Sequence, residues 1–142
     1  MRKFCADDAD FLEEARRRDF PDGWKREMIL SSLKGETFGG LIEEENGKTI
    51  AAITFDKAAG SADIECVYVL PEKRKNGYAL SLINALLAEL SESGTEKVFL
   101  EVRESNVPAR SLYQKAGFTE ISVRKRYYGE ENAVVMVKEI IR

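Results

Sequence analysis

The sequence of 142 residues contains no histidine, only two cysteines and only three prolines. Without histidine the chain cannot build Ser-His or Cys-His nucleophilic catalysis, or a zinc site that needs imidazole. Cys5 and Cys66 are too few for a disulfide scaffold and lack the spacing of metal ligands. We therefore expect no metal, and a catalytic proton must pass through a carboxylate, a tyrosine or water.

The chain also lacks long apolar runs and an excess of positive charge. Its longest apolar runs, such as 66–70 and 133–137, have five residues, whereas a membrane span needs about 20. The 22 basic and 25 acidic residues leave a net charge of −3, which argues against a basic nucleic-acid surface. The first residues turn acidic before any apolar stretch, so no signal peptide is expected. These absences predict a soluble cytoplasmic protein that binds neither nucleic acid nor membrane.

What the sequence does contain fits one domain spanning residues 1–142. Its composition is 44% hydrophobic and 33% charged, and about 100–150 residues is the commonest domain size. Apolar periodicity predicts the order β-α-α-β-β-β-α-β-α-β-β, hence an α/β (α+β) fold with a mixed sheet and helices on both faces. The expected strands are 2–6, 37–43, 49–55, 62–70, 97–103, 118–128 and 133–140. The expected helices end near residues 19 and 35 or span 77–93 and 107–116, with turns at 20–23 and 129–132.

Turn and cap residues support several of these boundaries. Asn46-Gly47 lies between two apolar runs and predicts a tight hairpin, because both turn residues need a positive φ. Gly94 follows the long helix and Gly117 follows the short one, as expected for helix C-caps. A helix start at Asn106 is favoured by the proline two positions later.

The segment between the strand 62–70 and the long helix has the composition of an anion site. Lys73, Arg74 and Lys75 are consecutive cations in an acidic protein. Gly77 and the small Ala79 let a ligand approach the backbone, and the first N–H groups of the helix have no partner within it. This combination suits a pyrophosphate, although a solvated basic loop is the simpler alternative. The segment matches neither the phosphate-binding loop of nucleotide hydrolases nor the dinucleotide fingerprint.

Written as Arg74-x-x-Gly77-x-Ala79, the same segment resembles the acetyl-CoA signature of the GNAT N-acetyltransferase superfamily. The resemblance implies that acetyl-CoA is the cosubstrate and that loop amides hold its pyrophosphate. It also implies a mostly antiparallel seven-stranded sheet whose two central parallel strands splay beside the pantetheine arm. The cofactor-binding residues that it implies are Cys66, Val67, Tyr68, Arg74, Lys75, Asn76, Gly77, Tyr78, Ala79 and Asn106.

A second resemblance covers the last third of the chain. Residues 100–106, Leu-Glu-Val-Arg-Glu-Ser-Asn, are followed by Leu-Tyr at 112–113 and Gly-Phe at 117–118. This pattern is similar to that of the N-terminal protein acetyltransferases, especially the RimI-type ribosomal-protein-alanine N-acetyltransferases. The Tyr-Tyr pair at 127–128 resembles the tyrosine-rich end of the same family, although Asn132 stands where an aspartate is usual.

The resemblance implies roles for two residues in direct acetyl transfer. Glu101 would be the general base, acting through a water, although an exposed glutamate paired with Arg103 is the simpler interpretation. Tyr113 would be the general acid, since a tyrosine pKa near 10 is not far above the ~8.5 of a thiol; a packed core tyrosine is the alternative. A backbone N–H near Val67 or Tyr68 would donate a hydrogen bond to the thioester carbonyl oxygen.

The acceptor can be argued from the pKa of its amine. An α-amine titrates at about 7.7–8.0 and a lysine amine at about 10.4, so neutral lysine costs roughly 3.5 kcal/mol more at pH 7. One glutamate base therefore suits a peptide or protein N-terminus, such as that of a ribosomal protein. The resemblance implies that Tyr127 and Tyr128 bind this substrate, although neighbouring strand residues face opposite ways. A small-molecule amine as acceptor, or a CoA-binding module without turnover, are the alternatives.

Overall fold

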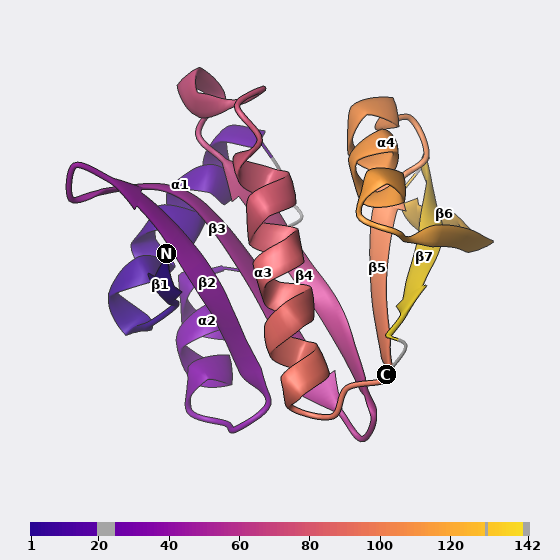
Figure 1. The fold of residues 1–142 in the computed structure, drawn as a ribbon. Helices are drawn as coiled ribbons and strands as arrows, with labels where there is room; N and C mark the ends of the chain where they lie inside the picture. Colours follow the sequence, from indigo (N-terminus) through magenta and orange to yellow (C-terminus); the bar gives the residue numbers. More distant parts are fainter. Residues whose placement is uncertain (20–24, 130, 141–142) are drawn as a thin grey trace.

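The computed structural model describes residues 1–19, 25–129 and 131–140. These residues form one seven-stranded sheet in the order β1-β2-β3-β4-β5-β7-β6 (Figure 1). The strands are β1 (Arg2–Lys3), β2 (Phe38–Glu45), β3 (Lys48–Ala58), β4 (Ser61–Val69), β5 (Lys97–Arg103), β6 (Thr119–Tyr128) and β7 (Glu131–Glu139). The helices are α1 (Ala9–Asp19), α2 (Arg26–Leu33), α3 (Tyr78–Glu92) and α4 (Val107–Lys115), with two short 3₁₀ turns, Ala6–Asp8 and Pro71–Lys73.

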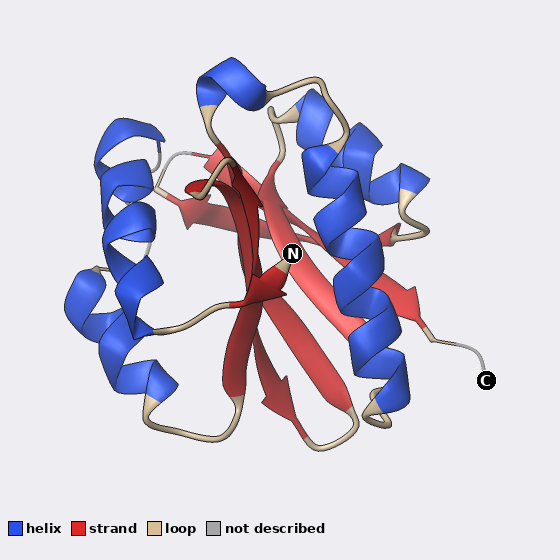
Figure 2. Cartoon of the chain, turned by 60° about the vertical axis from the view of Figure 1, so that its left-hand side comes forward, coloured by secondary structure: helices blue, strands red, loops and turns tan. Residues whose placement is uncertain are grey.

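Helices cover both faces of the sheet, as the periodicity predicts (Figure 2). On one face α3 packs onto the central strands, and its Leu82, Ile83, Leu86 and Leu90 are all fully buried. Their i, i+4 and i, i+3 spacing forms the apolar stripe that a surface helix needs. On the other face α1 and α2 bury a second cluster against β2 and β3. None of the described helices is long and apolar enough to cross a membrane.

The β2–β3 hairpin turns at the predicted position. Asn46 has φ 53° and Gly47 has φ 78°, the conformation that a two-residue hairpin turn requires. Both strands extend beyond the predicted limits, because backbone pairing continues from Glu44 and Glu45 to Thr49 and Lys48. These polar residues carry no apolar signal, so the periodicity could not show that they belong to the strands.

The central parallel strands diverge, which confirms the expected splay. β4 and β5 pair only at Ser61–Lys97, Ala62–Val98 and Asp63–Phe99. On the other side of β4, the register with β3 changes between Thr54–Cys66 and Phe55–Ile64. Glu65 is therefore the extra residue of a β-bulge, which bends the strand where the gap opens.

The N-terminal region differs from the prediction. The expected strand 2–6 is shortened to β1, and the chain continues into the 3₁₀ turn Ala6–Asp8, where the side chain of Asp8 is buried. The Asp8 carboxylate accepts hydrogen bonds from Arg2 Nη1 at 2.8 Å, Arg2 Nη2 at 2.7 Å and the Cys5 N–H at 2.9 Å. The predicted turn 20–23 and the apolar Trp24 lie outside the described residues.

Candidate active site

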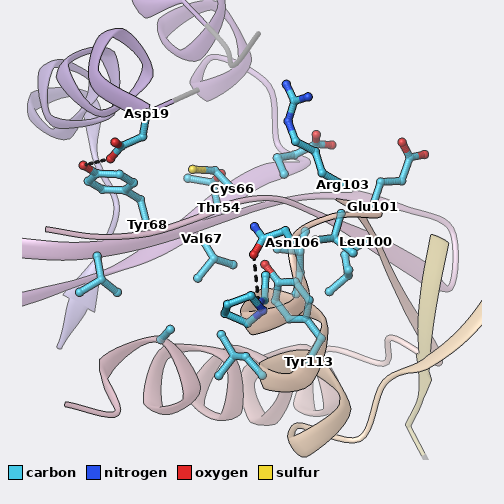
Figure 3. Close-up of a pocket in the computed structure, with 18 of the residues that line it drawn as sticks. Asp19, Thr54, Cys66, Val67, Tyr68, Leu100, Glu101, Arg103, Asn106 and Tyr113 are labelled. Atoms are coloured by element: carbon cyan, nitrogen blue, oxygen red, sulfur yellow. Dashed lines mark hydrogen bonds between the residues drawn. The ribbon is translucent and has the colours of Figure 1, made fainter. Parts of the chain in front are cut away.

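A cavity of about 1420 Å³ opens at the gap between β4 and β5 (Figure 3). It is lined by the second half of β4, the start of α3, most of β5 and one side of α4. The structure therefore brings together most of the residues singled out in the sequence. Those that line the cavity are Cys66, Val67, Tyr68, Arg74, Lys75, Gly77, Tyr78, Ala79, Glu101, Asn106, Tyr113 and Tyr127.

One end of the cavity has the backbone geometry of an anion site. Gly77 is the N-cap of α3 with φ +82°, and an added Cβ would meet nothing within 4 Å. The first turn of α3 carries no acidic residue, so no carboxylate of this turn neutralises its free N–H groups or the positive end of the helix dipole. This arrangement fits a phosphate group.

The neighbouring cations are largely engaged with protein groups. Lys73 Nζ lies 2.5 Å from Glu45 Oε1, and the Tyr78 hydroxyl donates to Glu45 Oε2 at 2.9 Å. These bonds from Lys73 and Tyr78 lower the pKa of Glu45. These bonds connect the hairpin turn after β2 to the loop that precedes α3. Asn76 shapes the same loop, because its amide donates to the Lys73 and Arg74 carbonyls at 3.0 and 3.2 Å.

Arg74 points to the α1 side of the sheet. Its guanidinium donates to Asp19 at 2.9 Å and to the Val69 carbonyl at 2.9 Å, and it lies 5.3 Å from the centre of the Tyr68 ring. The Tyr68 hydroxyl also donates to Asp19, at 2.7 Å. Among the predicted cofactor residues, Tyr68 and Arg74 thus present their side chains to α1. Cofactor contact by Arg74, Asn76 and the other predicted residues stays a prediction.

Glu101 lies on the opposite side of β5 from the buried Leu100 (Figure 3). Its Oε1 is 2.5 Å from Arg124 Nη1. Its Oε2 is buried and has no hydrogen-bond partner within the described part of the chain. A pairing of Glu101 with Arg103 is wrong: Arg103 bonds instead to Glu131, at 3.3 Å. No local pattern shows that Arg124 is the partner, because β6 follows β5 by about twenty residues in the sequence.

Tyr113 and Asn106 lie nearer the other face, where α4 covers the gap (Figure 3). The Tyr113 ring packs edge-on against Phe118, with centroids 6.2 Å apart, and also lines the cavity. The packed and the cavity-facing interpretations of Tyr113 therefore both hold. Asn106 is the N-cap of α4, since its Oδ1 accepts from the Ala109 N–H at 3.2 Å.

Tyr127 is about half exposed and stacks under the guanidinium of Arg124, 4.2 Å from the ring centre. Arg126 has φ 54°, and the register with β7 shifts between Arg124 and Tyr128. This bulge interrupts the regular alternation from which the faces of the two tyrosines were predicted. The side chain of Tyr128 lies outside the described part of the structure, so its role in substrate binding stays a prediction.

Two of the titratable groups of β4 that line the cavity, Glu65 and Cys66, have strongly raised pKa values. Burial, together with the charge of Glu65, raises the pKa of the Cys66 thiol to about 12. Cys66 is thus protonated at neutral pH and unsuited to act as an acyl-carrying nucleophile, which needs a thiolate. Partial burial raises the pKa of Glu65 to about 7, with added repulsion from Asp63, Asp56 and Glu101. The sequence analysis missed Glu65, because its neighbours Asp56 and Glu101 come from β3 and β5, and only the pairing of the strands brings these carboxylates near it.

Comparisons with known proteins agree with this architecture. A model of the acetyltransferase (GNAT) family matches residues 9–118. The ribosomal protein bS18-alanine N-acetyltransferase of Haemophilus influenzae is 38% identical over 112 residues, which cover 75% of this chain and 76% of that one. The crystal structure of the ribosomal-protein-S18-alanine N-acetyltransferase from Escherichia coli has a TM-score of 0.89 and 26% identity, covering 99% of this chain and 92% of that one.

The same fold occurs in a structure that contains the donor. NAA60 of Arabidopsis thaliana in complex with acetyl-CoA superposes with a TM-score of 0.85 at 20% identity, covering 98% of this chain and 97% of that one. The family match spans most of the chain, and the splayed sheet and the start of α3 at Gly77 provide its structural setting. The chain therefore belongs to the acetyltransferase (GNAT) family and is an N-acetyltransferase similar to the bS18-alanine enzymes.

Proposed function

We propose that this chain transfers the acetyl group of acetyl-CoA directly to the α-amine of a protein N-terminus, with a ribosomal protein beginning with alanine as the acceptor. The observation that carries the proposal is the placement of Glu101 and Tyr113 on either side of the β4–β5 gap, with one buried and unpaired oxygen on Glu101. The names of the relatives support the acceptor. Their ribosomal substrate also makes the cytoplasm the place of reaction in this proposal.

The donor is bound by backbone more than by charge in this proposal. The N–H groups at the start of α3, after Gly77, hold the pyrophosphate, and the gap beside Val67 admits the pantetheine arm. A backbone N–H of β4 is free of strand pairing where β4 diverges from β5. It donates a hydrogen bond to the thioester oxygen and stabilises the negative charge that develops there.

Glu101 and Tyr113 handle the two protons. Glu101, directly or through a water, takes the proton of the α-ammonium, so that the neutral nitrogen forms a bond to the acetyl carbon. As the carbon–sulfur bond breaks, Tyr113 gives its hydroxyl proton to the departing thiolate. The second proton that the nitrogen loses as it becomes an amide passes through solvent and restores the Tyr113 hydroxyl, and Glu101 releases its proton to solvent. Because the pKa of Cys66 is about 12, we exclude an acyl-enzyme on that thiol from the proposed path.

A thiol-release assay with acetyl-CoA tests the proposal. The acceptor panel contains alanine-first peptides with the bS18 terminus, the same peptides with a blocked N-terminus, and small amines such as a polyamine and an aminoglycoside. We expect release with the free alanine-first peptide alone. Preferred release with a small amine would move the function to small-molecule acetylation, and acetyl-CoA binding without any release would leave a CoA-binding module.

A further inference from the structure

Asp19 is the last residue of α1 and carries a charge that this end of a helix disfavours. Arg16, Arg17 and Arg18 precede it in the same turn, and such cations stabilise the negative end of the helix dipole. A carboxylate at that end is not stabilised by its own helix, so tertiary contacts must hold it there. A residue that departs from a local preference in this way is a candidate for a functional role.

The carboxylate of Asp19 joins two other parts of the fold. Its Oδ2 accepts a hydrogen bond from the Tyr68 hydroxyl of β4 at 2.7 Å and another from Arg74 Nη2 at 2.9 Å. Figure 3 shows Asp19 and Tyr68 on the same side of β4 as Cys66, and this is the side that α1 and α2 cover. Because Arg74 belongs to the loop between β4 and α3, Asp19 connects α1 to that loop.

The side chain of Arg74 is held from three directions. Besides its bond to Asp19, its Nε donates to the Val69 carbonyl at the end of β4 at 2.9 Å. Its guanidinium also lies over the Tyr68 ring, 5.3 Å from the centre. An isolated surface ion pair contributes little to stability, whereas a guanidinium in a network of contacts is fixed in position. These contacts fix the start of the loop relative to both β4 and α1.

The backbone after Arg74 has a conformation that needs such support. Lys75 has φ 66° and Gly77 has φ 82°, so both residues are left-handed. A non-glycine residue such as Lys75 is strained there, and the strain persists only where the surrounding structure imposes it. The Asn76 amide imposes part of it through its bonds to the Lys73 and Arg74 carbonyls. The anchored side chain of Arg74 is a second constraint on the same turn.

We propose that Asp19 is a positioning residue for the donor: by holding Arg74, it keeps the loop in the conformation that directs the first N–H groups of α3 at the pyrophosphate. The inference rests on the proposed binding of acetyl-CoA at Gly77. A direct contact between the Arg74 guanidinium and the pyrophosphate would instead place the phosphate in competition with Asp19. The two roles predict opposite results, because loss of the Asp19 charge weakens donor binding in the first case and strengthens it in the second.

The test compares two donors in the thiol-release assay with an alanine-first peptide. S-acetylpantetheine carries the same acetylated arm as acetyl-CoA but lacks the pyrophosphate. For Asp19→Asn we expect kcat/KM with acetyl-CoA to fall about fivefold through a higher KM, with kcat and the value for S-acetylpantetheine unchanged. Asp10→Asn makes the same change on the same helix, where the carboxylate pairs with Arg26 away from the cavity. This control should affect neither donor.

A double variant tests whether Asp19 acts through Arg74. Asp19→Asn should add no further loss to that of Arg74→Ala, because the two side chains belong to one network. Several results overturn the positioning role while acetylation itself stands: unchanged or tighter use of acetyl-CoA by Asp19→Asn, equal losses with both donors, or additive losses in the double variant. If Asp19→Asn does not fold, Tyr68→Phe decides in its place, since it removes one of the two bonds to Asp19. It should lower the preference for acetyl-CoA over S-acetylpantetheine, and an unchanged preference overturns the role.

The native protein separates this inference from the proposed function. We expect a higher kcat/KM with acetyl-CoA than with S-acetylpantetheine, because only the first donor reaches the start of α3 with a pyrophosphate. Equal values for the two donors would contradict the pyrophosphate site at Gly77. Release of thiol from neither donor would contradict the proposed acetylation, and either result overturns the role of Asp19 as well.

Discussion

The two ends of the cleft are built from different parts of the chain. The end where the pyrophosphate is proposed to bind is local and consists of a loop and a helix start, in which Gly77 provides the left-handed N-cap. The side where the acceptor is proposed to bind is assembled from side chains on different strands: Glu101 of β5 pairs with Arg124 of β6, 23 residues further along the chain. A local site depends on backbone conformation, whereas an assembled site depends on strand register. Single substitutions should therefore reduce either the affinity for acetyl-CoA or the turnover rate, and not both together.

The largest effect should come from the acceptor side. Glu101→Gln keeps the size of the side chain but removes the base, so kcat should fall by about 100-fold or more. The dissociation constant of acetyl-CoA should stay within about twofold, because the anion end is untouched. Steady-state kinetics and calorimetric titration measure the two quantities. Glu139→Gln, an exposed residue at the end of β7, is the matched control, and an unchanged kcat in Glu101→Gln would remove Glu101 from the mechanism.

The reverse pattern should follow from a change at the anion end. Gly77→Glu puts a charged side chain at φ +82°, where a non-glycine residue is strained and where it repels a phosphate. We expect acetyl-CoA affinity to fall by more than about tenfold. Gly60→Glu has the same strain at φ +76°, in the β3–β4 turn, and should leave affinity unchanged. Equal affinities for the two variants would contradict an anion site at the start of α3.

A smaller effect should come from the ion pair that holds Glu101. Arg124→Ala frees Glu101 Oε1, and we expect kcat to fall by about fivefold because the carboxylate is less well positioned. The affinity for acetyl-CoA should not change. Lys125→Ala changes the neighbouring cation on β6 and serves as the control. If Arg124→Ala matched the loss seen in Glu101→Gln, Arg124 would have to act on the substrate itself.

The smallest effect concerns stability and the carboxylates beside the gap. The pKa of Glu65 is raised to about 7 from a reference value of 4.5, so the folded chain binds this proton more tightly than the unfolded chain does. Stability should therefore fall as pH rises from 4.5 through 7. Glu65→Gln cannot ionise, and at pH 8 it should be more stable by about 1 kcal/mol, a figure reduced for solvent screening of this exposed residue.

Urea unfolding at pH 4.5 and pH 8 measures the difference. The two proteins should be nearly equal in stability at the lower pH, where Glu65 is protonated in the folded state and about half protonated in the unfolded state. Glu36→Gln lies on the surface before β2 and is the control: its difference in stability from the native protein should be the same at both pH values. If Glu65→Gln were less stable than the native protein at pH 8, the Glu65 carboxylate would stabilise the fold. Its destabilisation by burial and by repulsion from the neighbouring carboxylates would then be contradicted.

Local features of the sequence predicted much of this molecule. The stripe of α3, the Asn46-Gly47 turn and the alternation of β5 gave correct elements, because each is decided by residues close together in the chain. Pyrophosphate binding at Gly77 remains a prediction of the same local kind. The absence of histidine limited the proton chemistry to a carboxylate, a tyrosine or water before any arrangement in space was known.

Tertiary structure decided what lies across the gap. Arg124 as the partner of Glu101, and the gathering of Glu65 with carboxylates of β3 and β5, both follow from the pairing of the strands. Side-chain neighbours across a sheet are set by pairing between strands that are distant in the sequence, and a shift of one residue reverses every face. Sequence periodicity identifies the strands and their buried faces, but the pairing that fixes these contacts appears only when the chain is folded.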